Sequence, residues 1–195
     1  MTKGFIEAKE KALSMLHRDL ENEKVDKDLI SLLEKINKMD NFFTTSSCSG
    51  RILLLEIPEI GDKREARFIG RWHDTIAKDD ILSKIKKAKK GLLWLLAQPP
   101  VIHIGVKNLE SALKFMKIAN ESGFKNTVIK NIGKDKILIE ICSTERMDAP
   151  VGKNGKITCD EEHFKMLIKI ANNIIKRSKK KIKRLEKNLK ENLRI

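Results

Sequence analysis

Apolar residues recur at intervals of three and four along five segments of this chain, and polar or charged residues fill the positions between them. That spacing places the apolar side chains on one face of an α-helix. Asp26 and Asn108 are candidate N-caps, because their side-chain oxygens can accept a backbone N–H from the first helical turn. The pattern predicts helices over residues 3–23, 26–38, 79–90, 108–122 and 160–192.

The last of these helices follows a stricter rule than the others. Its apolar positions alternate between steps of four and three residues, which is a heptad seam that Ser178 interrupts. The expected partner of the seam is the N-terminal helix, packed antiparallel, and a coiled-coil dimer is the alternative. The seam positions are Phe164, Ile168, Ala171, Ile175, Ser178, Ile182, Leu185 and Leu189.

Shorter apolar or alternating segments, bounded by Gly, Pro, Asn and Asp, predict the strands. Residues 133–135 form a turn that joins two of them as a hairpin, and residues 148–155 are expected to be a loop. The strand 101–106, the helix that follows it and the strand from residue 128 resemble a β-α-β unit. The predicted strands are 42–46, 51–57, 66–73, 92–97, 101–106, 128–132 and 136–143.

These elements indicate an α+β fold. We expect a single domain over residues 1–195, with a mixed β-sheet flanked by helices and a long basic C-terminal helix at about 160–192. A chain of 195 residues is long enough for one domain with a substantial core and short for two. Hydrophobic residues make up 41% and charged residues 35%, as in globular proteins rather than disordered ones.

One short segment is unusually rich in small polar side chains. Every residue from 44 to 49 carries a hydroxyl or a thiol, and Gly50 and Arg51 follow. Backbone N–H groups and hydroxyls in such a segment can bind an anionic or polar ligand, and the arginine adds a planar fork for carboxylate or phosphate. The alternative is a β-turn between two strands, in which the hydroxyls satisfy the backbone of the turn.

Positive charge is concentrated at the C-terminal end. The formal net charge is +14, and residues 164–195 carry 12 Lys and Arg against two Glu. A basic helix of this kind indicates contact with a polyanion such as RNA, and the alternative is a solvated helix face in a lysine-rich protein. The candidate RNA contacts are Lys179, Lys180, Lys181, Lys183 and Arg184.

Several protein classes are disfavoured by composition. No run of about eighteen apolar residues predicts a membrane span, and residues 1–10 lack the apolar core of a secretory signal. Three cysteines without C-x-x-C spacing fit neither a disulfide framework nor a zinc site, and they favour the cytoplasm. The four histidines lack a metal-ligand spacing, so we expect no metal.

The hydroxyl-rich segment also carries a resemblance. The stretch F-F-T-T-S-S-C-S-G-R-I resembles the signature of the tRNA wybutosine-synthesising protein 3 family, and further matching segments follow in the same order. They are W-H at 72–73, V-I-H-I-G-V at 101–106, S-G-F-K-N at 122–126, I-C-S-T-E-R-M-D-A-P at 141–150 and A-N-N at 171–173. The resemblance therefore covers nearly the whole chain.

The resemblance implies a function and a cofactor. It implies an S-adenosylmethionine-dependent methyltransferase that modifies the N-4 ring nitrogen of the 7-aminocarboxypropyl-demethylwyosine base at position 37, in the anticodon loop of phenylalanine tRNA. None of the ten glycines forms a G-x-G-x-G run, so the cofactor would be held by a fold that is not Rossmann-like.

The same resemblance implies the site residues. His103 and His73 are the candidate catalytic residues, because a base can accept the proton that leaves the methylated nitrogen. A structural, hydrogen-bonded histidine is the alternative for each of them. Asn172 matches a further position of the family pattern. The residues expected to hold the cofactor or the substrate are Ser47, Ser49, Gly50, Arg51, Ser143 and Thr144.

Two other functions stay open from the residues alone. A non-catalytic RNA-binding module would fit the basic helix, but aromatic residues are only 5% of the chain and Tyr is absent, so base stacking on an open sheet has little support. An enzyme acting on a small anionic molecule would fit the hydroxyl-rich segment without requiring the basic helix.

Overall fold

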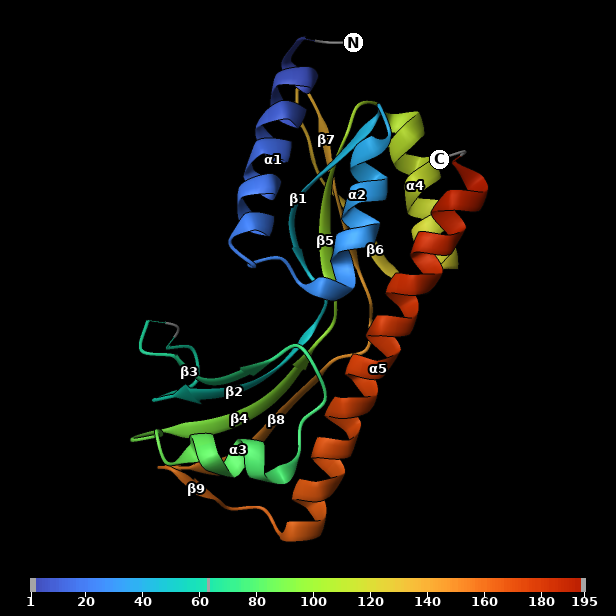
Figure 1. Cartoon of the computed structure of the whole chain (residues 1–195). Helices are drawn as coiled ribbons and strands as arrows, with labels where there is room; N and C mark the ends of the chain where they lie inside the picture. Colours follow the sequence, from blue (N-terminus) through green and yellow to red (C-terminus); the bar gives the residue numbers. More distant parts are fainter. Residues whose placement is uncertain (1–2, 63, 194–195) are drawn as a thin grey trace. The chain divides into compact units, whose positions relative to one another are not determined.

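The computed structural model describes residues 3–62 and 64–193, and these residues form two compact units. Each unit is built from segments that are far apart in the sequence, and the chain passes from one unit to the other four times (Figure 1). Of the described residues, the first unit contains 3–49, 100–144 and 178–193, and the second contains 50–62, 64–99 and 145–177.

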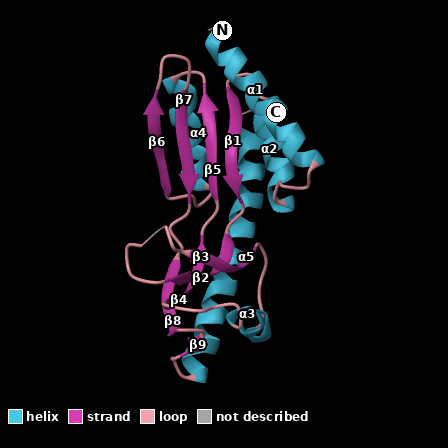
Figure 2. Ribbon diagram, turned by 90° about the vertical axis from the view of Figure 1, so that its left-hand side faces the viewer, coloured by secondary structure: helices cyan, strands magenta, loops and turns pink. Residues whose placement is uncertain are grey.

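The first unit is built on a four-stranded sheet in the order β1-β5-β7-β6 (Figure 2). All neighbouring strands in this sheet run antiparallel. The strands are β1 (Phe42–Cys48), β5 (Val101–Val106), β6 (Asn126–Ile132) and β7 (Ile137–Cys142).

Helices lie on both faces of this sheet. Leu33 of α2, Phe115 of α4 and Leu185 of α5 belong to the core on one face. On the other face α1 packs against β1, where the rings of Phe5 and Phe43 lie 5.3 Å apart. The helices are α1 (Lys3–Glu21), α2 (Ile30–Lys38) with a preceding 3-10 turn η1 (Lys27–Leu29), α4 (Leu109–Glu121) and α5 (Glu161–Asn192).

The second unit is built on a five-stranded antiparallel sheet in the order β3-β2-β4-β8-β9. One face of the sheet packs against α3 (Lys78–Ile85) and the first half of α5, with Leu95 and Ile168 in the shared core. The strands are β2 (Arg51–Ile57), β3 (Arg67–Trp72), β4 (Leu92–Gln98), β8 (Met147–Lys153) and β9 (Lys156–Ile157). In the described part of the chain, no helix is both long and apolar enough to cross a membrane.

The α+β class, the long C-terminal helix and the absence of a Rossmann-like pattern are confirmed. The sheet differs in detail from the expected mixed sheet, because the strands form two sheets and every pair is antiparallel. The strands β5 and β6, joined through α4, do run parallel, but β7 lies between them and pairs with both. The prediction of a single domain over residues 1–195 stays a prediction.

Three local predictions were wrong. Residues 148–155 are largely strand β8 rather than a loop, because pairing with β4 outweighs the low strand propensity of a segment that contains Pro150. The strand predicted over residues 42–46 extends through Cys48, since β5 supplies its backbone partners. Asp26 makes no capping hydrogen bond, because a 3-10 turn follows it and its carboxylate accepts the backbone N–H of Ser49 instead.

The heptad seam of α5 is confirmed as buried, but its partner is not the N-terminal helix. All eight seam positions are at most 7% exposed. The positions from Phe164 to Ile175 belong to the core of the second unit, and those from Ile182 to Leu189 belong to the core of the first. Ser178 falls between the two sets, so the polar interruption in the sequence marks the point where one helix leaves one core and enters another.

Candidate functional site

The ends of β1 and β7 and the start of β5 lie side by side at one end of the first sheet, and the predicted serines follow β1 and β7 directly. Cys48 at the end of β1 is the partner of Val101 at the start of β5, and Val101 is the partner of Cys142 at the end of β7. Ser49 and Ser143 each lie one residue beyond those strand ends. The two polar segments that the sequence separates by more than ninety residues therefore meet at one end of this sheet.

The hydroxyls at this end of the sheet are buried. The Oγ atoms of Ser47 and Ser49 are both inaccessible to solvent and have no hydrogen-bond partner among the described residues. Ser143 is only 3% exposed, whereas Thr144 is exposed. A buried hydroxyl without a partner costs roughly 1–3 kcal/mol. Two of them, two residues apart in the same segment, indicate a polar ligand or ordered water at this position.

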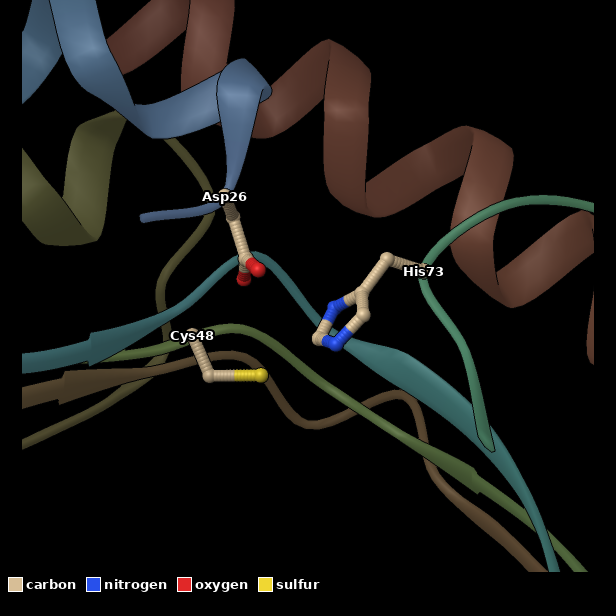
Figure 3. A group of neighbouring side chains, drawn as sticks. All are labelled: Asp26, Cys48 and His73. Carbon is tan, nitrogen blue, oxygen red and sulfur yellow. The ribbon is translucent and has the colours of Figure 1, made fainter. Parts of the chain in front are cut away.

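A carboxylate fixes the backbone of the hydroxyl-rich segment. Asp26 Oδ2 accepts the N–H of Ser49 at 2.7 Å, and the side chain of Cys48 lies beside it (Figure 3). On the same segment, Asn37 and Thr44 exchange two hydrogen bonds of 2.8 Å. These contacts hold the segment from the side of α2 and η1.

His103 lies in the middle of β5 within a line of hydrogen bonds. Its Nδ1 is 2.7 Å from the exposed Ser46 Oγ, and its Nε2 is 2.7 Å from Glu140 Oε2 on β7. Lys130 on β6 contacts the other carboxylate oxygen at 3.3 Å. Burial works to raise the pKa of the Glu140 carboxyl, but hydrogen bonds from His103 and Lys130 outweigh it and hold that pKa below its ordinary value.

The consequence of this arrangement is a polarised imidazole next to a hydroxyl. Glu140 is ionised at neutral pH and favours a proton on Nε2 of His103. Nδ1 is then free to accept the Ser46 O–H, and Ser46 faces solvent. A serine, a histidine and a carboxylate in this order can take up a proton from a group placed beside the serine.

The remaining residues of the signature belong to the second unit. Gly50 has a φ of +97°, a left-handed conformation that other residues rarely adopt. Arg51 Nε donates to Gln98 Oε1 at 2.9 Å, which orients the guanidinium at the start of β2. His73 is exposed, and its Nδ1 is 3.1 Å from the carbonyl oxygen of Gly50. These three residues therefore gather at one end of the second sheet.

Asn172 has a local structural role. It lies on α5, where its Oδ1 accepts the N–H of Ile76 at 2.9 Å and its Nδ2 donates to the carbonyl of the same residue at 2.8 Å. The side chain of Asn172 thereby satisfies both the N–H and the carbonyl of Ile76, in the segment after β3. This clamp fixes the backbone after β3 against α5.

Replacing Asn172 with Ala should destabilise the protein by about 1–3 kcal/mol, because both backbone groups of the 5%-exposed Ile76 lose their partner. Urea unfolding followed by circular dichroism measures the change. Asn173→Ala is the matched control, since Asn173 is the neighbouring residue and is exposed. Equal stability of the two variants would contradict the clamp.

The predicted RNA contacts on α5 differ in their surroundings. Lys180 and Lys183 are exposed. Lys179 forms an ion pair with Asp28 at 3.1 Å, and the Nε of Arg184 donates to the carbonyl of Ser122 at the end of α4 at 2.7 Å. Lys179 and Arg184 thus contribute to packing within the first unit, whereas the two exposed lysines present their charge to solvent.

A pocket of about 760 Å³ lies at the other end of the first sheet, where β1 and α4 begin. None of the residues predicted to bind cofactor or RNA lines it. Its walls include Lys38, Asn41, Asn108, Ser111 and Lys114.

Sequence reasoning missed four residues that contact the predicted site. Asp26 contacts Ser49, and Gln98 contacts Arg51. Ser46 and Glu140 both contact His103. Ser46 lies inside the hydroxyl-rich segment, and that position was its only signal. The other three come from separate elements and carry no local signal, because strand pairing and helix packing bring them to the site.

The fold defines an α+β protein with two antiparallel sheets, outside the Rossmann-like class. Polar residues of the signature lie at one end of each sheet, Ser49 and Ser143 beside the first and Arg51 in the second. The family model described as "Methyltransferase TYW3" matches residues 7–191, and the chain therefore belongs to this methyltransferase family. A methyltransferase family implies a methyl donor.

Relatives match over nearly their full length. A protein from Pyrococcus furiosus, named tRNA(Phe) 7-((3-amino-3-carboxypropyl)-4-demethylwyosine(37)-N(4))-methyltransferase 1, is 46% identical over 188 residues, which are 96% of each chain. A similarly named methyltransferase from Methanocaldococcus jannaschii is 35% identical and covers 96% of this chain and 98% of that one.

Solved structures share the fold. A protein from Pyrococcus horikoshii superimposes with a TM-score of 0.91 at 46% identity, covering 95% of this chain and 96% of that one. A hypothetical protein from Aeropyrum pernix has a TM-score of 0.75 at 26% identity, covering 87% of this chain and all of that one.

Proposed function

We propose that this protein methylates the N-4 ring nitrogen of the 7-aminocarboxypropyl-demethylwyosine base at position 37 of phenylalanine tRNA, with S-adenosylmethionine as the donor and in the cytoplasm. The observation that carries the proposal is the 46% identity to the Pyrococcus furiosus methyltransferase over 96% of both chains. The family model, which matches residues 7–191, covers parts of both units and every segment of the signature.

The residues at the end of the first sheet fit a polar cofactor. S-adenosylmethionine, when bound, supplies a methyl group on a positively charged sulfur. Ser47 and Ser49 offer two buried hydroxyls without partners, and each can donate to a carboxylate or accept from an amino or hydroxyl group. Ser143 adds a third hydroxyl at the neighbouring strand end. In the second unit, Arg51 is the candidate for an anionic group.

The ring nitrogen must lose a proton when it gains a methyl group. We assign its acceptance to His103, through the exposed hydroxyl of Ser46 or directly at Nδ1. Glu140 accepts the Nε2 proton in a hydrogen bond, so that the Nδ1 lone pair faces Ser46. Alignment of donor and acceptor contributes the larger part of the rate enhancement, and proton acceptance adds to it.

The direct test combines methyl transfer with binding. The protein is incubated with S-adenosylmethionine labelled in the methyl group and with precursor phenylalanine tRNA, and label in the modified base is measured. Calorimetry measures binding of the donor in parallel. Steep, salt-dependent tRNA binding without transfer and without donor binding would instead identify a non-catalytic RNA-binding module.

The exposed lysines of α5 predict a salt effect. Replacing Lys180 and Lys183 with Ser should weaken tRNA binding and reduce the slope of log affinity against log salt by about two, because each lysine releases roughly one counterion. Replacing Lys11 and Lys24, which are exposed on and after α1, is the control. An unchanged slope in the first variant would make the basic helix a solvated face.

A further inference from the structure

The second sheet carries a row of apolar side chains, two of them aromatic, on the face opposite α3 and α5. Phe68 on β3 is the partner of Leu55 on β2, Leu55 is the partner of Trp94 on β4, and Trp94 is the partner of Pro150 on β8. Directly opposed residues of antiparallel strands share a face. The core residues Leu54, Leu93 and Leu95, which alternate with them, point to the helices.

We call these four side chains the cross-strand row. The row is open to solvent at both ends. Phe68 is 47% exposed, Pro150 is exposed, and Leu55 and Trp94 between them are half-buried. Strands lie about 4.8 Å apart, so four of them give the row a width of about 14 Å.

Two features of the cross-strand row point to a polar, negatively charged aromatic ligand. Arg71 lies on the same strand β3, opposite Leu53 of β2. Its guanidinium is 4.3 Å from the centre of the Phe68 ring. The indole N–H of Trp94 is buried and has no hydrogen-bond partner among the described residues, although a buried indole N–H is normally satisfied. The row therefore presents stacking surface and a positive charge, with an unsatisfied indole N–H buried beneath it.

We propose that the cross-strand row is a stacking platform for unpaired bases of the tRNA substrate. The inference rests on the proposed function and names the surface that would bind the RNA loop. Aromatic rings next to arginines bind single-stranded RNA by stacking on its bases, while the guanidinium contacts phosphate. A width of about 14 Å exceeds one base and accommodates successive bases of a loop.

The adenine of a methyl donor is the competing occupant. A donor requires one ring-sized site, whereas the row continues across four strands from β3 to β8. Arg71 is exposed at the edge strand of the sheet, where a phosphate backbone can approach it. Charge and width therefore favour RNA, and the experiment separates the two occupants.

The test uses the full-length protein and an unmodified RNA transcript of the anticodon stem–loop of phenylalanine tRNA. Phe68→Leu keeps an apolar side chain but removes the ring, and should weaken RNA binding about tenfold, which is the usual loss for one stacked base. Donor binding, measured by calorimetry, should be unchanged. Arg71→Gln should lower the salt slope by about one, whereas Arg18→Gln on α1 should not.

Fluorescence gives a readout specific to the row. The chain has two tryptophans, and Trp72 packs against the core on the opposite face from Trp94. RNA should quench tryptophan emission in the Trp72→Phe variant and leave it unchanged in the Trp94→Phe variant. Because phenylalanine can replace indole in both positions, circular dichroism should show both variants folded.

Three results would overturn the platform. They are undiminished RNA affinity in Phe68→Leu, loss of donor affinity with RNA affinity retained, and quenching that persists in Trp94→Phe. Methyl transfer by the wild-type protein is measured alongside. If the wild type transfers methyl and Phe68→Leu binds RNA equally well, the platform alone fails; if RNA stacks on the row without any transfer, the proposed function alone fails.

Discussion

Replacing His103 with Gln is expected to lower the rate of methyl transfer about a hundredfold or more, while the affinities for tRNA and donor change little. Glutamine can still contact Ser46 and Glu140 but cannot accept a proton, and loss of a general base typically costs this much. The rate is measured in a single turnover with saturating tRNA, so that binding and product release do not contribute.

Two companion variants separate proton acceptance from simple packing. Glu140→Gln should slow transfer less than His103→Gln does, because a neutral amide fixes the Nε2 proton less firmly but leaves the imidazole in place. Lys130→Met removes only the distal charge and is the control. Full activity of His103→Gln over the whole pH range would exclude His103 as the proton acceptor.

The second large effect is on stability. Leu185→Ala and Ile175→Ala should each lower the free energy of unfolding by about 2–5 kcal/mol, because both side chains are at most 1% exposed and their removal leaves a cavity. Ile170→Ala, at a position of the same helix that is 39% exposed, should cost much less. Urea unfolding followed by circular dichroism measures all three.

Hydrogen exchange locates each effect. Leu185 belongs to the core of the first unit and Ile175 to that of the second, although one helix carries both. Amide protection should therefore fall most in β5 and β7 for Leu185→Ala and in β2 and β4 for Ile175→Ala. If Ile170→Ala were as destabilising as either, the burial of the seam would not be what stabilises α5.

Helix α5 shows which features the periodicity of apolar residues can predict and which it cannot. The alternating steps of four and three were sufficient to predict a helix of the observed length with one buried stripe, and the structure confirms both. The predicted partner, the N-terminal helix, was wrong, because a stripe of apolar residues has the same sequence pattern whether it packs against a helix or a sheet. The break at Ser178 was visible in the sequence, but its meaning required the two cores.

In the candidate site, too, local sequence predicted some residues and tertiary contacts placed the others. Hydroxyl-rich residues 44–49 and the second polar segment were recognisable because their residue types and order are local properties of the chain. Glu140 beside His103 and Asp26 beneath Ser49 were not, because a carboxylate in a strand or a turn has no local signal for its partner. Base stacking on a sheet had little support from composition, yet register places Phe68 and Trp94 in one row.

The sequence by itself determined the helices and most strands, the buried stripe of α5, the concentration of positive charge and the family signature. These depend on the order of neighbouring residues along the chain, which periodicity and composition report directly. Only the tertiary structure decided which strands pair, that they form two sheets, and which side chains meet at their ends and across their faces. Strand register is set by contacts between residues far apart in sequence, and one step of register exchanges the two faces of a strand.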